Sequence, residues 1–159
     1  MIEQATEQIG KALGRIPSGC AIITARSTSG STGMLASWIQ QASFDPPTIT
    51  VALKKGRPIE QLIEESGAFV VNILGENPSA MFKHFGKGFS LGEEAFAGLD
   101  TKDVEDGIVI PDQIAWLSAK VLGRHEAADH WVYIAKLSDA GIEEITPPYV
   151  HLRKNGLSY

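Results

Sequence analysis

The sequence predicts a mainly β protein whose strands form an antiparallel barrel with a few peripheral helices. About seven β-type runs follow one another with short turns, and two or three short helical segments interrupt the series. Because strands and helices do not alternate regularly, a doubly wound parallel sheet is disfavoured. The chain has 159 residues and contains neither an internal repeat nor a linker-like stretch, so residues 1–159 are predicted to form one domain.

The N-terminal segment is predicted to be a helix with one apolar face that ends at Gly14. Its apolar residues recur three or four positions apart, at Ile2, Ala5, Ile9, Ala12 and Leu13. A β-type run follows at residues 19–25, and a Gly- and Ser-rich hairpin loop is predicted at 27–33. A further strand is expected at 34–42.

The run Asp45-Pro46-Pro47 interrupts the strands, because neither proline can donate to a ladder inside a sheet. β-branched residues then predict a strand at 48–53. Pro58 suits the first turn of a helix, which is expected to run to residue 65 and to stop at Gly67. The nearly continuous apolar run at 68–74 predicts a strand that is buried on both faces.

The second half of the chain is predicted to contain one short helix, a long irregular segment and several strands. The helix is expected at 78–85. The segment 86–107 is polar and irregular, with three apolar anchors at Phe89, Phe96 and Leu99. Strands are expected at 114–123, 130–138, 141–145 and 149–152, with a turn at 126–129 between the first two.

Composition excludes several classes of function. The chain has 14 Lys and Arg against 19 Asp and Glu, a net charge of −5, and no extended basic patch, so nucleic acid is not an expected partner. Apolar runs are too short to span a bilayer, and no membrane association is predicted. Cys20 is the single cysteine and lies in an apolar run, which favours a packing role over a reactive thiol. The N-terminus lacks the features of a signal peptide, so a cytoplasmic location is expected.

Several common catalytic motifs are missing from the sequence. It contains no dinucleotide-binding or P-loop glycine motif, no G-x-S-x-G elbow and no H-E-x-x-H pair. Adjacent glutamates diverge on helices and strands, so they are interpreted as solvated faces. No metal site is predicted; His125 and His130, five positions apart across a predicted turn, are a disfavoured alternative.

A basic cluster lies where a β-run meets a helix start. Lys54, Lys55, Gly56 and Arg57 end the run and immediately precede Pro58. Helix N-termini carry free N–H donors and a partial positive charge, so the cluster is a candidate anion site. The alternative is an ordinary solvated basic turn.

Two further segments are candidates for ligand binding. The stretch 33–47 mixes small hydroxyl residues with Trp38 and Phe44, which suits a flat ring with a polar edge. From these residues alone, an ordinary sheet strand with surface Ser and Gln is the favoured interpretation. The segment Asp129-His130-Trp131 places a histidine at a strand start. His130 is either a surface histidine capped by Asp129 or a cation near a cofactor or substrate.

The order of these segments resembles the flavin reductase-like, FMN-binding split-barrel family. The motifs that carry the resemblance are Gly14-Arg-Ile-Pro-Ser-Gly19, Ala36-Ser37, Ser43-Phe-Asp-Pro-Pro47, the run 66–74, Phe96-Ala-Gly98, Ala115-Trp116-Leu117 and Asp129-His130. Together they extend from about residue 9 to the end of the chain. Within the family, the sequence most resembles the C-terminal flavin reductase-like domain of large flavodiiron proteins of oxygenic phototrophs. That likeness rests on Leu35-Ala-Ser-Trp38, Lys83-His-Phe85, Asp129-His-Trp131 and the ending 151–156.

The resemblance implies a six-stranded antiparallel Greek-key split barrel, commonly a homodimer with FMN near the subunit interface. It implies a flavin wall made by Ser18, Met34, Leu35, Ala36, Ser37, Trp38, Ser43 and Phe44. It implies phosphate binding by Lys54, Lys55, Gly56 and Arg57, and places His130 near the nicotinamide of NADH or NADPH. Two segments and one single residue depart from the family pattern: Leu35-Ala-Ser-Trp38, Lys54-Lys-Gly56 and Ala128.

The resemblance implies NAD(P)H:flavin oxidoreductase activity, either self-contained or as the reductase module of a flavodiiron O2 reductase. The alternative is a non-enzymatic FMN electron-transfer module that a protein partner reduces. A split-barrel interaction domain without flavin is disfavoured, because the basic cluster and the Ala36-Ser37 stretch are both retained. In either of the first two cases a diiron or flavodoxin-like module is a candidate partner.

Overall fold

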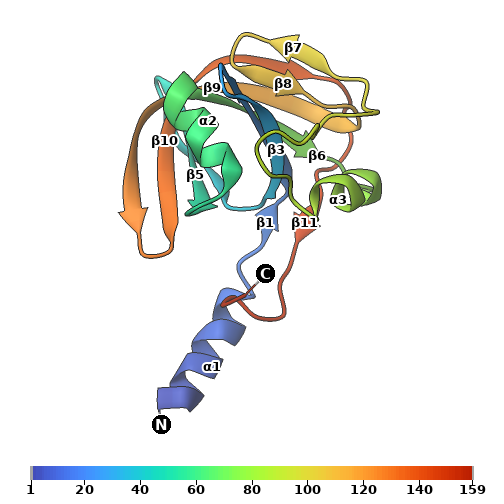
Figure 1. Cartoon of the computed structure of the whole chain (residues 1–159). Coiled ribbons are helices and arrows are strands. Elements are labelled where there is room, and N and C mark those ends of the chain that lie inside the picture. The colour runs from blue at the N-terminus through green and yellow to red at the C-terminus, as the bar shows by residue number, and fades with distance from the viewer. Residues whose placement is uncertain (1, 159) are drawn as a thin grey trace.

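A computed structural model describes residues 2–158 as a strongly bent antiparallel sheet from which one helix projects (Figure 1). The helices are α1 (Ile2–Leu13), α2 (Pro58–Ser66) and α3 (Ser79–Phe85). The main-sheet strands are β2 (Ala21–Ser27), β3 (Gly30–Ala36), β4 (Ile39–Phe44), β5 (Pro47–Lys54), β6 (Ala68–Leu74), β9 (Gln113–Ala127) and β10 (His130–Ile142). The short pairs are β1 (Ser18–Gly19) with β11 (Val150–His151), and β7 (Lys102–Val104) with β8 (Gly107–Val109).

The main sheet closes on itself at a corner in the chain. Its strand order is β3-β2-β6-β9-β10-β5-β4, so β3 and β4 lie at opposite edges. Only Ser37 and Trp38 separate these two strands in the sequence. The chain therefore crosses from one edge of the sheet to the other within two residues. The backbone N–H of Ala52 donates to the carbonyl of Trp38 at 2.9 Å and fixes the corner to β5.

The mainly β, antiparallel architecture predicted from the sequence is confirmed. The sheet has seven strands as the structure divides them. When β3 and β4 are taken as one strand bent at the corner, six strands remain, as the resemblance implied. Every neighbouring pair in this sheet is antiparallel.

The barrel interior is packed against α2, which lies beside β2 and β3 (Figure 1). Ile59, Leu62 and Ile63 of this helix are fully buried among the inward side chains of the strands. The helix starts at Pro58 and ends at Gly67, whose left-handed backbone lets its N–H reach the carbonyl of Ile63 at 2.8 Å. Both ends agree with the sequence-based prediction to within one residue.

Strand β6 is buried on both of its faces, as its unbroken apolar run predicted. Phe69 and Val71 face the barrel interior, whereas Val70 packs with Val109 and Trp116 on the other side. Asn72 is fully buried within this strand. Its side-chain NH2 donates to the carbonyls of Ile22 and Ile108 at 3.1 and 3.2 Å, and its Oδ1 accepts the N–H of Ile110 at 3.0 Å.

The segment after α3 is mostly irregular, and Phe89, Phe96 and Leu99 anchor it against a second apolar cluster, as expected. The strands β7 and β8 within and after it were not predicted, because three-residue strands are too short to show a periodic pattern. They are held by tertiary contacts instead: the Thr24 hydroxyl donates to the carbonyl of Ile108 at 2.5 Å.

Several strand boundaries differ from the predictions for identifiable reasons. The 27–33 loop is reduced to residues 28 and 29, because the Gly- and Ser-rich stretch that follows is an edge strand rather than a turn. The expected 34–42 strand is broken at the barrel corner. The expected separate strand at 141–145 is wrong; β10 continues through irregular pairing to Ile142, and residues 143–145 lie outside any strand.

Helix α1 has the predicted extent and projects from the barrel beside the C-terminal segment (Figure 1). Its apolar face, which the sequence pattern identified, is exposed: Ile9 retains 54% of its accessible surface. Within residues 2–158, no helix is both long and apolar enough to cross a lipid bilayer.

The buried amide of Asn72 provides a test of the packing described above. The Asn72→Ala variant removes three buried hydrogen bonds, including the one that satisfies the N–H of Ile110, so we expect a loss of about 2–4 kcal/mol in unfolding free energy. Urea denaturation monitored by circular dichroism measures it. Gln40→Ala, at an exposed position on β4, should change stability by less than about 0.5 kcal/mol. Equal stability of the two variants would contradict this account of Asn72.

Candidate functional site

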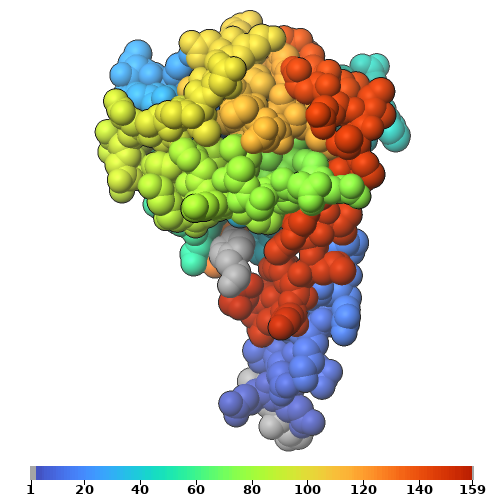
Figure 2. Space-filling view, turned by 90° about the vertical axis from the view of Figure 1, so that its right-hand side faces the viewer, coloured from blue at the N-terminus to red at the C-terminus, as the bar shows by residue number. Residues whose placement is uncertain are grey.

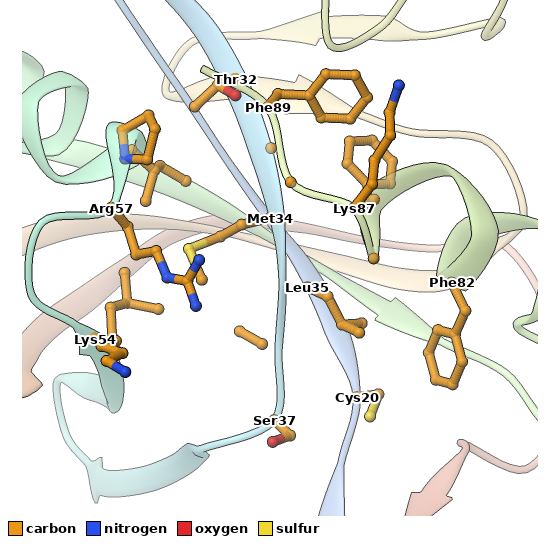
Figure 3. Close-up of a pocket in the computed structure, with 18 of the residues that line it drawn as sticks. Cys20, Thr32, Met34, Leu35, Ser37, Lys54, Arg57, Phe82, Lys87 and Phe89 are labelled. Carbon is orange, nitrogen blue, oxygen red and sulfur yellow. The ribbon is translucent and has the colours of Figure 1, made fainter. Parts of the chain in front are cut away.

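A cleft of about 760 Å³ follows strand β3 on the outside of the barrel corner (Figure 3). This volume lies within the usual range for small-molecule sites. The cleft extends to β5 and the start of α2 on one side of β3, and to α3 and the loop after it on the other. Strand β3 therefore divides the cleft into two lobes.

The backbone of β3 itself forms the floor of the cleft. Side chains alternate between the two faces of a strand, yet all seven consecutive residues from Thr32 to Trp38 line the cavity. This is possible because β3 is an edge strand, paired only with β2, so half of its N–H and C=O groups lie on the free side. The cleft thus offers a row of backbone donors and acceptors.

Gly33 permits close packing at this edge. A Cβ atom built on Gly33 would lie 2.8 Å from the ring carbon Cε1 of Phe85. Phe85 is buried and packs directly over the β3 backbone, so any side chain at residue 33 would displace it.

The first lobe carries two cations rather than the four-residue cluster expected from the sequence. Lys54 and Arg57 line the cleft and lie on the same side of β3 in Figure 3. Lys55 instead forms an ion pair with Glu126 and lies 4.8 Å from the ring centre of Trp131. Gly56 does not line the cleft either, and its N–H donates to Glu60 at 2.8 Å. The structure thus separates Lys55 and Gly56 from the candidate anion site.

The second lobe was not predicted from the sequence. Phe82, Lys87 and Phe89 line it and lie across β3 from Arg57 (Figure 3). Lys87 Nζ lies 4.7 Å above the ring centre of Phe89. Phe89 was expected only as an apolar anchor, and Lys87 was not among the candidate binding residues. Cys20, Thr32 and His151 also line the cleft and were not predicted to do so.

Trp38 lines the cleft and also contacts two residues, His130 and Arg153, that do not line it. Its ring lies 4.8 Å from that of His130, with an interplanar angle of 38°, and 5.0 Å from the guanidinium carbon of Arg153. His130 Nδ1 and Asp129 Oδ1 are 2.8 Å apart. This hydrogen bond lowers the pKa of the Asp129 carboxyl below its ordinary value. The Asp129 contact was anticipated, but His130 is buried and is therefore not a surface histidine.

The structure brings together just over half of the residues that the resemblance implied. Lining the cleft are Met34, Leu35, Ala36, Ser37, Trp38, Lys54 and Arg57. Outside the cleft lining are Ser18, Ser43, Phe44, Lys55, Gly56 and His130. Ser18 pairs with His151 in the β1–β11 ladder. Phe44 lies at the end of β4 and is 90% exposed, so it forms no wall of this cleft.

The cleft also contains a buried polar group and a buried thiol. The Thr32 hydroxyl has no hydrogen-bond partner among residues 2–158 although it is buried, which fits a site completed by a bound molecule. Burial raises the pKa of the Cys20 thiol to about 11, so the thiol remains neutral at physiological pH. No group of three or more His, Cys, Asp or Glu side chains within the described part of the chain could hold a metal ion.

Comparison with known proteins agrees with this architecture. The sequence profile of the flavin reductase like domain matches residues 13–156, almost the whole chain. The chain belongs to the flavin reductase-like family. The resemblance inferred from the sequence motifs is thereby confirmed.

Relatives of this flavin reductase-like chain include much longer proteins. It is 39% identical over 163 aligned positions to diflavin flavoprotein A 1 of Synechocystis sp., an alignment that covers 99% of this chain and 28% of the relative. The chain therefore spans just over a quarter of the length of this curated relative.

Two solved structures have a fold similar to that of this chain. Nitrilotriacetate monooxygenase component B from Mycobacterium thermoresistibile superposes with a TM-score of 0.80 at 27% identity, covering 95% of this chain and 83% of that chain. The styrene monooxygenase flavin reductase of Pseudomonas putida S12 has a TM-score of 0.74 at 26% identity, covering 89% and 90%.

The raised pKa of Cys20 predicts slow alkylation of this flavin reductase-like chain. Only the thiolate reacts, and at pH 8 a thiol with the pKa of about 11 has roughly two-hundredfold less thiolate than an ordinary cysteine. Iodoacetamide labelling followed by mass spectrometry should therefore be negligible at pH 8 and should rise toward pH 11. Urea-unfolded protein is the control. Labelling of the native protein as fast as the unfolded control would contradict the assignment.

Proposed function

We propose that this chain binds FMN in the β3 cleft and reduces it with hydride from NADH or NADPH. The observation that carries the proposal is the meeting, in one cleft, of a free backbone edge with the cations Lys54 and Arg57. A flavin has a flat ring with polar atoms along its edge, and FMN has one terminal phosphate. The backbone groups of the β3 floor suit the polar edge of the ring, and Lys54 and Arg57 in the first lobe suit the phosphate.

Each part of the cleft has a role in this proposal. Residues 34–38 hold the ring, and Lys54 and Arg57 hold the phosphate. Bound flavin would supply the redox chemistry by accepting the hydride, so no protein side chain has to transfer it. Backbone N–H groups on the free edge of β3 are suited to stabilise negative charge on the ring. Met34, Leu35 and Trp38 exclude water from its faces.

The second lobe is the proposed position of the pyridine nucleotide. Lys87 is a cation for its phosphates, and the rings of Phe82 and Phe89 offer apolar surfaces for its bases. The two lobes share β3, so molecules bound in them would lie against the same strand. In this arrangement His130 is a positioning residue, because its ring packs against the ring of Trp38 and holds it in place.

A second candidate function is electron transfer without NAD(P)H, with a protein partner as the donor. The observation that favours it is that the chain covers only 28% of diflavin flavoprotein A 1. A relative of that length has room for other redox modules, and a diiron or flavodoxin-like module is the proposed partner.

We further propose that the chain forms a homodimer.

Anaerobic stopped-flow mixing distinguishes the two functions. The FMN-loaded protein is mixed with NADH or NADPH, and flavin bleaching is followed near its visible absorbance band. Saturable, rapid bleaching by one nucleotide supports the reductase. Bleaching no faster than that of free FMN with either nucleotide contradicts the reductase and favours the electron-transfer module.

The phosphate assignment predicts a selective loss of FMN affinity. Lys54→Ala and Arg57→Ala should each weaken FMN by roughly tenfold or more, since a charge-assisted hydrogen bond contributes about 1.5–3 kcal/mol. Riboflavin, which lacks the phosphate, should bind with nearly unchanged affinity. Fluorescence titration measures both. Lys55→Ala is the matched control, because Lys55 lies outside the cleft. Equal weakening of FMN and riboflavin would refute the assignment.

The role of His130 can be tested separately. We expect His130→Ala to slow flavin reduction by about tenfold, equivalent to about 1.4 kcal/mol, while FMN remains bound. The reason is that Trp38 loses the ring that supports it on one side. His125→Ala, at an exposed position on β9, is the control. An unchanged reduction rate would remove His130 from the mechanism, and loss of FMN would place it in flavin binding.

A further inference from the structure

The two cations of the first lobe are held in place by different parts of the molecule. Lys54 is the last residue of β5 and pairs with His130 in the ladder, so the sheet fixes its backbone. Arg57 follows three positions later, immediately before α2. Between them, Gly56 has a positive φ of 76°, a conformation that glycine adopts readily. The point at which Arg57 enters the cleft therefore depends on this turn rather than on the sheet (Figure 3).

One side chain holds the second half of this turn. The first half is held by the backbone, since the N–H of Lys55 donates to the carbonyl of Asp129 at 3.0 Å. The N–H of Gly56 instead donates to Oε2 of Glu60 at 2.8 Å. Glu60 is the third residue of α2, the position from which a carboxylate commonly reaches back over the start of a helix. Its carboxylate thus joins the helix to the turn that carries Arg57.

The other carboxylate oxygen of Glu60 is bound from the sheet. Arg124 of β9 donates from Nη1 to Oε1 of Glu60 at 3.1 Å. The same nitrogen lies 3.1 Å from Oε1 of Glu64, one turn further along α2. The guanidinium carbon lies 3.9 Å from the ring centre of Trp131. Arg124 is therefore placed by contacts on several sides, and it holds Glu60 in the orientation that reaches Gly56.

The charge of Glu60 opposes this geometric effect. A carboxylate beside an anion site repels the anion, so its charge alone would weaken phosphate binding there. Arg124 offsets part of that charge. The hydrogen bond to Gly56, in contrast, fixes the turn and favours phosphate binding. The two effects predict opposite results when the carboxylate is removed.

We propose that Glu60 is a positioning residue for the phosphate site. Its carboxylate, held by Arg124, fixes the turn at Gly56 so that Arg57 meets the phosphate of FMN beside Lys54. This inference rests on the phosphate site of the proposed function and identifies what keeps that site in shape.

Removing the carboxylate tests the proposal. Glu60→Ala should weaken FMN by roughly threefold to tenfold, because Arg57 then loses part of a charge-assisted hydrogen bond to the phosphate. Riboflavin should bind with nearly unchanged affinity. Glu60→Gln keeps an oxygen that can accept the N–H of Gly56, so it should bind FMN at least as tightly as the wild type. Fluorescence titration measures both ligands. Unchanged or tighter FMN binding by Glu60→Ala would overturn the proposal.

Glu64→Ala is the matched control on the same helix. Glu64 pairs with Arg124, but within residues 2–158 it makes no hydrogen bond or ion pair with the turn 54–57. This variant should therefore bind FMN like the wild type. If it weakens FMN as much as Glu60→Ala does, the effect belongs to α2 as a whole, and the role assigned to Glu60 is wrong.

A double variant tests whether Glu60 acts through Arg57. Changes that remove the same contact are not additive. Arg57→Ala combined with Glu60→Ala should therefore bind FMN no more weakly than Arg57→Ala alone. A further loss as large as that of Glu60→Ala by itself would show that Glu60 acts independently of Arg57, contrary to the proposal.

Amide exchange in the protein without FMN separates this proposal from the phosphate assignment. In Glu60→Ala the N–H of Gly56 loses its acceptor, so its hydrogen exchange, followed by NMR, should be about threefold faster or more. In Glu64→Ala it should keep the wild-type rate. Equal rates at Gly56 in Glu60→Ala and the wild type would refute the role of Glu60 and leave the phosphate assignment intact. Wild-type FMN affinity in Arg57→Ala would instead refute the phosphate assignment, and with it the contact that Glu60 is proposed to position.

Discussion

The corner at Ser37 and Trp38 is the constraint on which the rest of the molecule depends. It takes the chain from one edge of the sheet to the other, so the barrel closes through covalent continuity rather than through hydrogen bonds between β3 and β4. The free side of β3 is consequently left without a neighbouring strand. An exposed strand edge is ordinarily a liability, and here α3 and the loop after it lie over it at a distance that leaves a cleft. Barrel closure and the candidate binding site thus have one physical origin.

Much of this fold could be predicted because its signals are local. Pro58 and Gly67 bound a helix through backbone geometry that each residue imposes by itself. The apolar run of β6 reflects burial on both faces, whatever its neighbours are. The two strands β7 and β8 could not be predicted, since β8, with which β7 pairs, accepts hydrogen bonds from Thr24 and Asn72, which lie far away in the sequence.

The candidate site was predicted less completely, for two distinct reasons. Lys54 and Lys55 were grouped as one cluster, although consecutive side chains at a strand end point to opposite sides; Lys54 reaches the cleft and Lys55 reaches Glu126. Lys87 was missed for another reason. It meets β3 only because Phe85 packs on Gly33, a contact between residues that are 52 positions apart. No periodicity in a single sequence reveals such a contact.

Helix α1 and the cleft are joined through the C-terminal segment. Strand β11 pairs with β1, and His151 of that strand lines the cleft. Two residues later, the guanidinium of Arg153 lies 5.0 Å from the ring of Trp38, while its carbonyl packs against Gly14 at the end of α1 (Figure 2). The same short segment therefore contacts the barrel corner on one side and closes the glycine face of α1 on the other. The packing of this segment thus positions α1 and a wall of the cleft together.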